Sequence, residues 1–199
     1  MSVAAAILTL VLLRLRAVPR RVGLLLGAAA ILLCTWAGLT LPDIDQPLPL
    51  DHRSAVTHSI LPAAAMTIRQ WMRPVAAGLA LGIGLHLAAD VFPNAMTGYA
   101  TVKLPFGGSI GGDLSYAWLA GNAVACTGLG AWLLRSEVED LLVRQLLFVA
   151  VVLLGLSYLL LTDGGWPALA LYGAVGWIAL RARSGRVSSR GADDWVRGA

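Results

Sequence analysis

Charged residues are scarce in this chain of 199 residues: Asp, Glu, Lys and Arg make up 13% of the sequence, against 58% hydrophobic residues. That balance excludes an ordinary soluble domain, in which about a quarter of the residues are charged. Cysteines are also few, and both Cys34 and Cys126 lie inside apolar runs without CxxC spacing. A disulfide scaffold and a thiolate zinc cluster are therefore excluded, and we interpret both cysteines as small buried hydrophobic residues.

Apolar runs recur along the sequence, and several approach the roughly 20 residues that a helix needs to cross a membrane. Nothing resembles the alternating strands of a barrel, so helices are the expected spanning structure. The sequence predicts an all-α fold, a polytopic transmembrane bundle of about six to seven helices within residues 1–182. The apolar segments lie at about 2–13, 22–41, 54–68, 74–92, 114–134, 145–162 and 165–181. Residues 183–199 are polar and are expected to form a disordered cytoplasmic tail.

Basic residues fall in short clusters between the apolar segments, which indicates membrane topology rather than nucleic-acid binding. If all seven segments cross, every basic residue except Arg53 and Lys103 lies on one side. The positive-inside rule then predicts an inner-membrane protein with its N-terminus outside and its C-terminus in the cytoplasm. Segment 54–68 decides this topology. A re-entrant loop there would move Arg69 and Arg73 to the outer side and invert all later segments, unless a second segment also failed to span, so charge favours a full crossing.

Three short stretches place ionisable groups in apolar surroundings, and the predicted topology brings all three to the outer surface. They are residues 41–45 (Leu-Pro-Asp-Ile-Asp), 52–59 (His-Arg-Ser-Ala-Val-Thr-His-Ser) and 86–90 (His-Leu-Ala-Ala-Asp). His86 and Asp90 are four residues apart, so a helix presents both on one face, where they can share a cation. Because ionisable groups inside a membrane helix are costly, they are usually paired or kept for function.

Each stretch also has a structural interpretation. A Pro-Asp-Ile-Asp segment at a helix end is often a solvated turn, and His86 with Asp90 is consistent with a plain hydrogen-bonded pair. Taken together, all histidines of the chain lie on one predicted face beside three aspartates, which favours a metal site. Imidazoles with carboxylates suit zinc, with manganese or iron as alternatives.

At these residues the sequence resembles the LexA-regulated membrane-bound metal-dependent hydrolases. The family pattern runs from Leu-Pro-Asp-hydrophobic-Asp through a His-Arg stretch ending in Thr-His-Ser to His-Leu-x-x-Asp. Thr97, Gly98 and Pro105 follow as the pattern requires, and the resemblance covers residues 38–106. The family is distantly similar to zinc-dependent phospholipase C and single-strand nucleases, which implies phosphoesterase chemistry with one to three metal ions.

Carried over to this chain, the resemblance implies six metal ligands. They are Asp43, Asp45, His52, His58, His86 and Asp90. Two features depart from the family pattern. Gln46 stands where many members carry His, and the six residues between Asp45 and His52 are fewer than in other members. We therefore expect fewer bound metal ions or a narrower entrance to the metal site than in other members.

The leading functional hypothesis is hydrolysis of an ester or phosphoester of a lipid-like substrate at the outer membrane face. Asp43 or Asp45 is expected to orient a water or accept its proton. Arg53 is expected either to bind phosphate or to be an exposed arginine that touches lipid headgroups. Thr57 and Ser59 are expected to hold the imidazoles in place. Two alternatives stay open: a metal- or proton-coupled transporter, and a non-catalytic protein with a structural His–Asp cluster. Membrane lipids are the expected partners.

Overall fold

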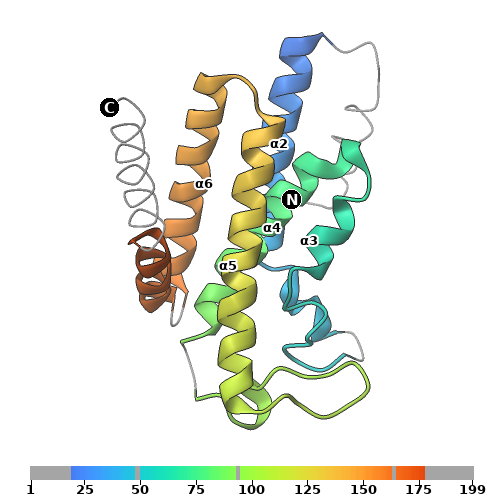
Figure 1. Ribbon diagram of the computed structural model, residues 1–199, viewed down its shortest axis with the longest axis vertical. Coiled ribbons are helices and arrows are strands. Elements are labelled where there is room, and N and C mark those ends of the chain that lie inside the picture. The colour runs from blue at the N-terminus through green and yellow to red at the C-terminus, as the bar shows by residue number, and fades with distance from the viewer. Residues whose placement is uncertain (1–18, 48–49, 93–94, 163–164, 178–199) are drawn as a thin grey trace, which may run out of the picture.

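The computed structural model describes residues 19–47, 50–92, 95–162 and 165–177, and Figure 1 gives the helix labels used below. The predicted segment at 2–13 and the predicted tail at 183–199 lie outside the described residues. The α-helices are α2 (Arg20–Gly38), α3 (Leu61–Met66), α4 (Arg73–Asp90), α5 (Gly112–Glu137) and α6 (Leu141–Leu161). The short 3-10 helices are η1 (Pro42–Asp45), η2 (Gln70–Met72) and η3 (Gly98–Ala100). Residues 165–177 are also helical.

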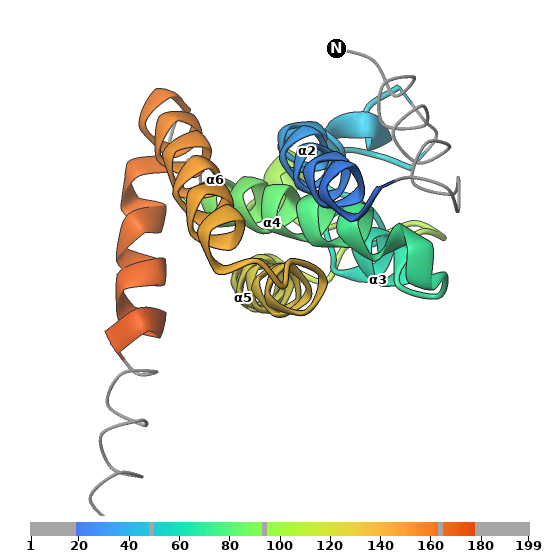
Figure 2. The ribbon, with the colours of Figure 1, turned by 90° about the horizontal axis from the view of Figure 1, so that it is seen from above.

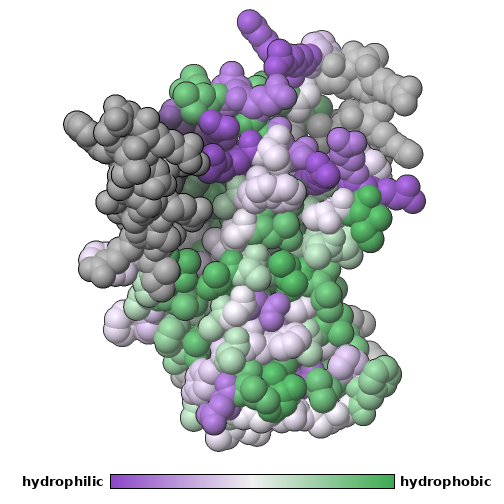
Figure 3. Space-filling view, in the orientation of Figure 1, coloured by the Kyte–Doolittle hydropathy of each residue, from purple (hydrophilic) through white to green (hydrophobic). Residues whose placement is uncertain are grey.

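The described chain is all-α, as predicted, and four of its helices are long and apolar enough to cross a membrane. These candidate spans are Arg20–Gly38, Gln70–Asp90, Gly112–Glu137 and Leu141–Leu161. Large apolar side chains on α6 face outward, including Leu146, 61% exposed, and Leu160, 65% exposed. Apolar surface also forms a broad belt in Figure 3, below a more polar end of the molecule. These features suggest an integral membrane protein in which the lateral surface of the helix bundle contacts lipid.

Helix α4 forms the centre of the bundle. Seen from above, α4 lies between α2 and α5 (Figure 2), and 72% of its spanning window is buried. Small residues allow this close packing, because a Cβ atom on Gly82 would lie 2.7 Å from the Cα of Gly38 in α2. On the opposite side, a Cβ atom on Gly130 of α5 would lie 3.0 Å from the carbonyl oxygen of Ala77 in α4. Such close approach is the usual basis of helix association in a membrane.

Ion pairs gather four helix ends at one end of the bundle. Arg20, at the start of α2, lies 2.9 Å from Glu139, which precedes α6. Arg73, at the start of α4, lies 3.7 Å from Glu137, at the end of α5. We call this the Arg-rich end. The last turns of α2, α4 and α6 and the first turn of α5 therefore lie at the opposite end, at the bottom of Figure 1.

Segment 54–68 differs from the predicted spanning helix. Its α-helix, α3, has six residues and rises about 9 Å, which is too short to cross a membrane. The residues before α3 do not continue the helix, because Ser54 and Thr57 hydrogen-bond the side chain of Asp45 instead. The chain nevertheless returns to the Arg-rich end before α4, where Arg73 lies 3.7 Å from Glu137.

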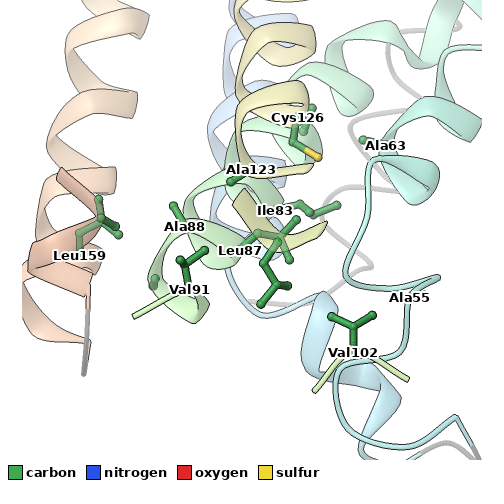
Figure 4. Packing of buried hydrophobic residues seen from close by; sticks show 14 of the residues in the cluster. Ala55, Ala63, Ile83, Leu87, Ala88, Val91, Val102, Ala123, Cys126 and Leu159 are labelled. Atoms are coloured by element: carbon green, nitrogen blue, oxygen red, sulfur yellow. The ribbon is translucent and has the colours of Figure 1, made fainter. Parts of the chain in front are cut away.

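The connection between α4 and α5 is fixed to the segment that precedes α3. The N–H of Ala55 donates to the carbonyl of Lys103 at 2.8 Å, and the N–H of Lys103 donates to the carbonyl of Arg53 at 2.9 Å. Val102 is fully buried beneath the end of α4, in the same cluster as Ala55 and Leu87 (Figure 4). This buried cluster holds the segment before α3 and the connection between α4 and α5 against the end of α4.

Replacing Gly82 with Ala should destabilise the bundle, because the new methyl group would run into the carbonyl oxygen of Thr35 and the backbone of Gly38. Overpacking of this kind costs about 1–3 kcal/mol. The control is Gly128→Ala in α5, where no atom lies within 4 Å of the new methyl group. Thermal unfolding in detergent, followed by circular dichroism, should show a lower midpoint for Gly82→Ala alone. Equal midpoints for the two variants would contradict the packing described.

Candidate metal centre

Three side chains from separate elements meet at the end of the bundle opposite the Arg-rich end. They are Asp43 in η1, His58 before α3 and His86 in the last turns of α4. One potential ligand atom from each lies within 4.8 Å of the others. His58 is fully buried and His86 nearly so, whereas the side chain of Asp43 is 41% exposed. The trio therefore joins two enclosed imidazoles to a carboxylate at the surface, a group that could hold a metal ion.

Asp90 lies against both imidazoles. Its Oδ2 atom is 3.4 Å from His58 Nε2 and 3.6 Å from His86 Nε2. The Oδ1 atom of Asp43 is 3.8 Å from the same nitrogen of His86. Ligand atoms about 2.0–2.1 Å from a tetrahedral zinc ion are separated by about 3.4 Å. These three pairs thus have nearly the spacing of a coordination shell, while the trio of Asp43, His58 and His86 is more open, with its ligand atoms within 4.8 Å of one another.

Both imidazoles are held through their Nδ1 atoms. His86 Nδ1 lies 2.8 Å from the carbonyl oxygen of Leu39, which follows α2, and 3.2 Å from the Tyr158 hydroxyl of α6. His58 Nδ1 lies 3.1 Å from Asp45 Oδ2. A carbonyl or carboxylate partner favours the proton on Nδ1, which leaves the Nε2 lone pair free. Both free lone pairs belong to the nitrogens that lie beside Asp90.

Unpaired buried polar atoms concentrate at this site. In the described part of the chain, six buried side-chain nitrogen or oxygen atoms have no hydrogen-bond partner. They are Asp45 Oδ1, His52 Nδ1, Arg53 Nε, His58 Nε2, His86 Nε2 and Asp90 Oδ2. Folded proteins pair the great majority of such atoms, and an unpaired group calls for an explanation such as a bound ion. All six atoms belong to residues that the sequence predicted for the site, so the donor set fits a metal ion.

The charges of the cluster favour a cation. Asp43, Asp45 and Asp90 bring three carboxylates, and Arg53 brings one guanidinium, which leaves two negative charges when the imidazoles are neutral. Arg53 is 4% exposed, its Nε lies 3.2 Å from Asp90 Oδ2, and its NH1 group donates to the Ala100 carbonyl at 2.7 Å. Burying uncompensated charge is costly. One divalent cation would balance the excess.

The burial of Arg53, 4% exposed, contradicts the expected alternative of an exposed arginine that touches lipid headgroups. Its side chain is enclosed and touches Asp90 on one side and the connection between α4 and α5 on the other. Arg53 therefore holds the carboxylate of Asp90 in position. Binding of phosphate by Arg53 stays a prediction.

Asp45 is fully buried and is placed to orient His58. Its Oδ2 atom accepts hydrogen bonds from the backbone N–H of Ser54 at 2.8 Å and from the hydroxyl of Thr57 at 2.9 Å. Burial alone would raise the pKa of Asp45, but His58 and these hydrogen bonds hold it below its usual value. Asp45 is thus a carboxylate that supports an imidazole, and a ligand role for its unpaired Oδ1 stays a prediction.

The pKa of His58 reflects competition between burial and its neighbours. Burial lowers the pKa, but the carboxylates of Asp45 and Asp90 more than compensate and raise it above the ordinary value. A metal ion at Nε2 would therefore compete with protonation of the same imidazole.

His52 lies at the edge of the site. Its ring stacks on Tyr99 with centroids 4.3 Å apart, and its centroid is 6.3 Å from that of His58. Burial and the positive charge of Arg53 lower the pKa of His52, which favours the neutral imidazole. The residues on either side, Asp51 and Arg53, have φ values of 62° and 59°, a left-handed backbone that costs energy in residues other than glycine. The structure does not bring His52 into the trio, and its ligand role stays a prediction.

Gln46 reaches the surface of the site. Its amide Nε2 donates to Asp43 Oδ1 at 3.2 Å, the same oxygen that faces His86. The residue at which this chain departs from the family pattern thus contacts a candidate ligand. Ser59, expected to hold an imidazole, instead donates to the carbonyl of Val56 at 2.8 Å.

Sequence reasoning missed several supporting groups. Tyr158 was read as part of an apolar segment, although its hydroxyl lies 3.2 Å from His86 Nδ1. Trp118 of α5 donates from Nε1 to the carbonyl of His58 at 2.8 Å, and Asn122 accepts from the N–H of Ile60 at 2.9 Å. Tyr158 and Asn122 could have been noticed as polar side chains within apolar helices. The contact of the Leu39 backbone carbonyl with His86 has no signal in the sequence.

Comparison of the chain with protein-family models, with curated proteins and with solved structures gave no match.

Changing Asp45 to Asn should weaken metal binding by about 10- to 100-fold, because the carboxylate that orients His58 is lost while the shape of the side chain is kept. Competition with a chromophoric zinc chelator measures the affinity. The control is Asp113→Asn, at the exposed start of α5, which should leave the affinity unchanged. Equal affinities for wild type and Asp45→Asn would overturn the role assigned to Asp45.

Proposed function

We propose that this protein is a membrane-embedded, metal-dependent hydrolase that acts on an ester or phosphoester of a lipid-like substrate. The observation that carries the proposal is the set of unpaired buried atoms around Asp90 and the two Nε2 nitrogens. A purely structural His–Asp cluster would satisfy these atoms within the protein.

His58, His86, Asp90 and Asp43 would hold the ion, which we take to be zinc, with manganese or iron as alternatives. A bound divalent cation would act as a Lewis acid and would lower the pKa of a bound water toward neutrality. Asp43 is the most exposed carboxylate of the group, at 41% against 20% for Asp90 and 0% for Asp45. It is thus the carboxylate best able to accept a proton from a water that enters from the surface.

Membrane lipid is the substrate class that the surroundings of the site favour. Apolar side chains are exposed on the neighbouring connection, with Tyr99 at 70%, Leu104 at 43% and Phe106 at 102% of full exposure. Tyr99 also stacks on His52, so this surface is continuous with the site. Exposed aromatic residues are common where a protein meets the membrane interface. A substrate that stays in the membrane could reach Asp43 from that side.

The orientation that we propose places the site outside the cell. Arg20 and Arg73 lie at the other end of the bundle, and the positive-inside rule assigns such an end to the cytoplasm. The protein would then lie in the inner membrane, with its N-terminus outside and its C-terminus in the cytoplasm. We also propose membership of the LexA-regulated membrane-bound hydrolases, on the motifs at 41–45, 52–59 and 86–90.

An activity screen of purified protein against phospholipids and soluble phosphodiesters, with and without chelator, tests the function. Turnover should require zinc and should fall at least about 100-fold in His86→Ala, because the variant loses one ligand and its contact with Leu39. Asp113→Asn is the matched control and should retain wild-type turnover.

Chelator-insensitive turnover, or full activity in His86→Ala, would refute the metal-dependent mechanism. If zinc binds but no ester is cleaved, the site is a metal site without hydrolase activity.

A further inference from the structure

A groove of about 860 Å³ runs along α6 and is separate from the candidate metal centre. Arg135, in the last turn of α5, and Arg144, in the first turn of α6, line one end. Leu159, in the last turn of α6, lines the other end. The 16 residues from Arg144 to Leu159 rise about 22 Å along the helix axis, more than the roughly 15 Å of one leaflet of a membrane. The groove is therefore long enough to hold a lipid acyl chain.

The middle of the groove suits hydrocarbon. Its walls are mostly apolar side chains, among them Leu85, Val152 and Leu156. The two hydroxyl groups on the wall are satisfied by the protein: Thr127 donates to the carbonyl of Ala123 at 2.8 Å, and Tyr172 donates to the carbonyl of Gly84 at 2.9 Å. No hydroxyl there needs a polar ligand.

The arginine end of the groove has positive charge without a partner. Among the described residues, no carboxylate pairs with Arg135 or Arg144. The nearby acidic residues are already engaged: Glu137 with Arg73, Glu139 with Arg20, and Asp140 as the cap that accepts from the N–H of Val143. An anion from outside the described chain is the natural counterpart.

We propose that this groove binds an anionic phospholipid of the leaflet at the Arg-rich end. Arg135 and Arg144 hold the phosphate of the headgroup, and one acyl chain lies along α6 against Val152 and Leu156. The inference is independent of the hydrolase proposal, because the metal centre lies at the opposite end of the bundle.

Native mass spectrometry of the delipidated full-length protein tests this site with phosphatidylglycerol and phosphatidylcholine of identical chains. The wild type should retain phosphatidylglycerol about tenfold more strongly, a preference that two arginines near a membrane surface can supply. The double variant Arg135→Gln/Arg144→Gln should lose the preference. Its charge-matched control, Arg21→Gln/Arg69→Gln, changes two exposed arginines outside the groove and should keep it.

A second pair of variants tests the apolar part of the groove while both arginines stay in place. Val152→Trp fills the groove and should abolish retention of the lipid, whereas Leu153→Trp, on a neighbouring residue outside the lining, should not. The proposal is overturned if the wild type shows no preference, if the arginine variant keeps it, or if Val152→Trp binds as well as Leu153→Trp. It is also overturned if the groove variants break up a lipid-free dimer, because a second copy would then be the occupant.

Discussion

The close contact between α2 and α4 is the constraint on which the candidate site depends. Glycines at 38, 78 and 82 let the two backbones approach, and the carbonyl of Leu39 thereby comes within 2.8 Å of His86 Nδ1. That hydrogen bond turns Nε2 toward Asp90 and Asp43. A wider separation of the helices would leave an imidazole in the bundle with neither a fixed tautomer nor a shared partner.

Electrostatics explains why the residues at this end form a network rather than separate pairs. Asp90 Oδ2 faces Arg53, His58 and His86 at 3.2–3.6 Å, and Asp45 supports His58 from behind. Because the carboxylates exceed the fixed positive charge, the network gains most from a further cation. The same balance is reversed at the Arg-rich end, where two arginines on the groove have no acidic partner within the part of the chain that the structure describes. The two ends thus favour ligands of opposite charge.

Much of this arrangement could be predicted from local sequence. Long apolar runs predict α2, α4, α5 and α6, since length and hydropathy alone decide whether a helix can span a membrane. The i, i+4 spacing predicts that His86 and Asp90 share a face, and they do, 3.6 Å apart. Both features depend only on neighbouring residues.

Other features depend on contacts between distant residues. Segment 54–68 has the apolar composition of a helix, but the hydrogen bonds of Ser54 and Thr57 with Asp45 take the place of helical ones. The role of Asp45 as a support for His58 and the burial of Arg53 likewise follow from packing across the bundle. No spacing rule along the chain encodes these contacts.

X-ray absorption spectroscopy of the zinc-loaded, full-length protein would test the metal centre, because it reports the atoms bound to the ion. We expect one or more zinc ions per chain, with two imidazole nitrogens at about 2.0–2.1 Å and the remaining ligands oxygen atoms. A protein that takes up no zinc, or a spectrum without imidazole scattering, would contradict this expectation.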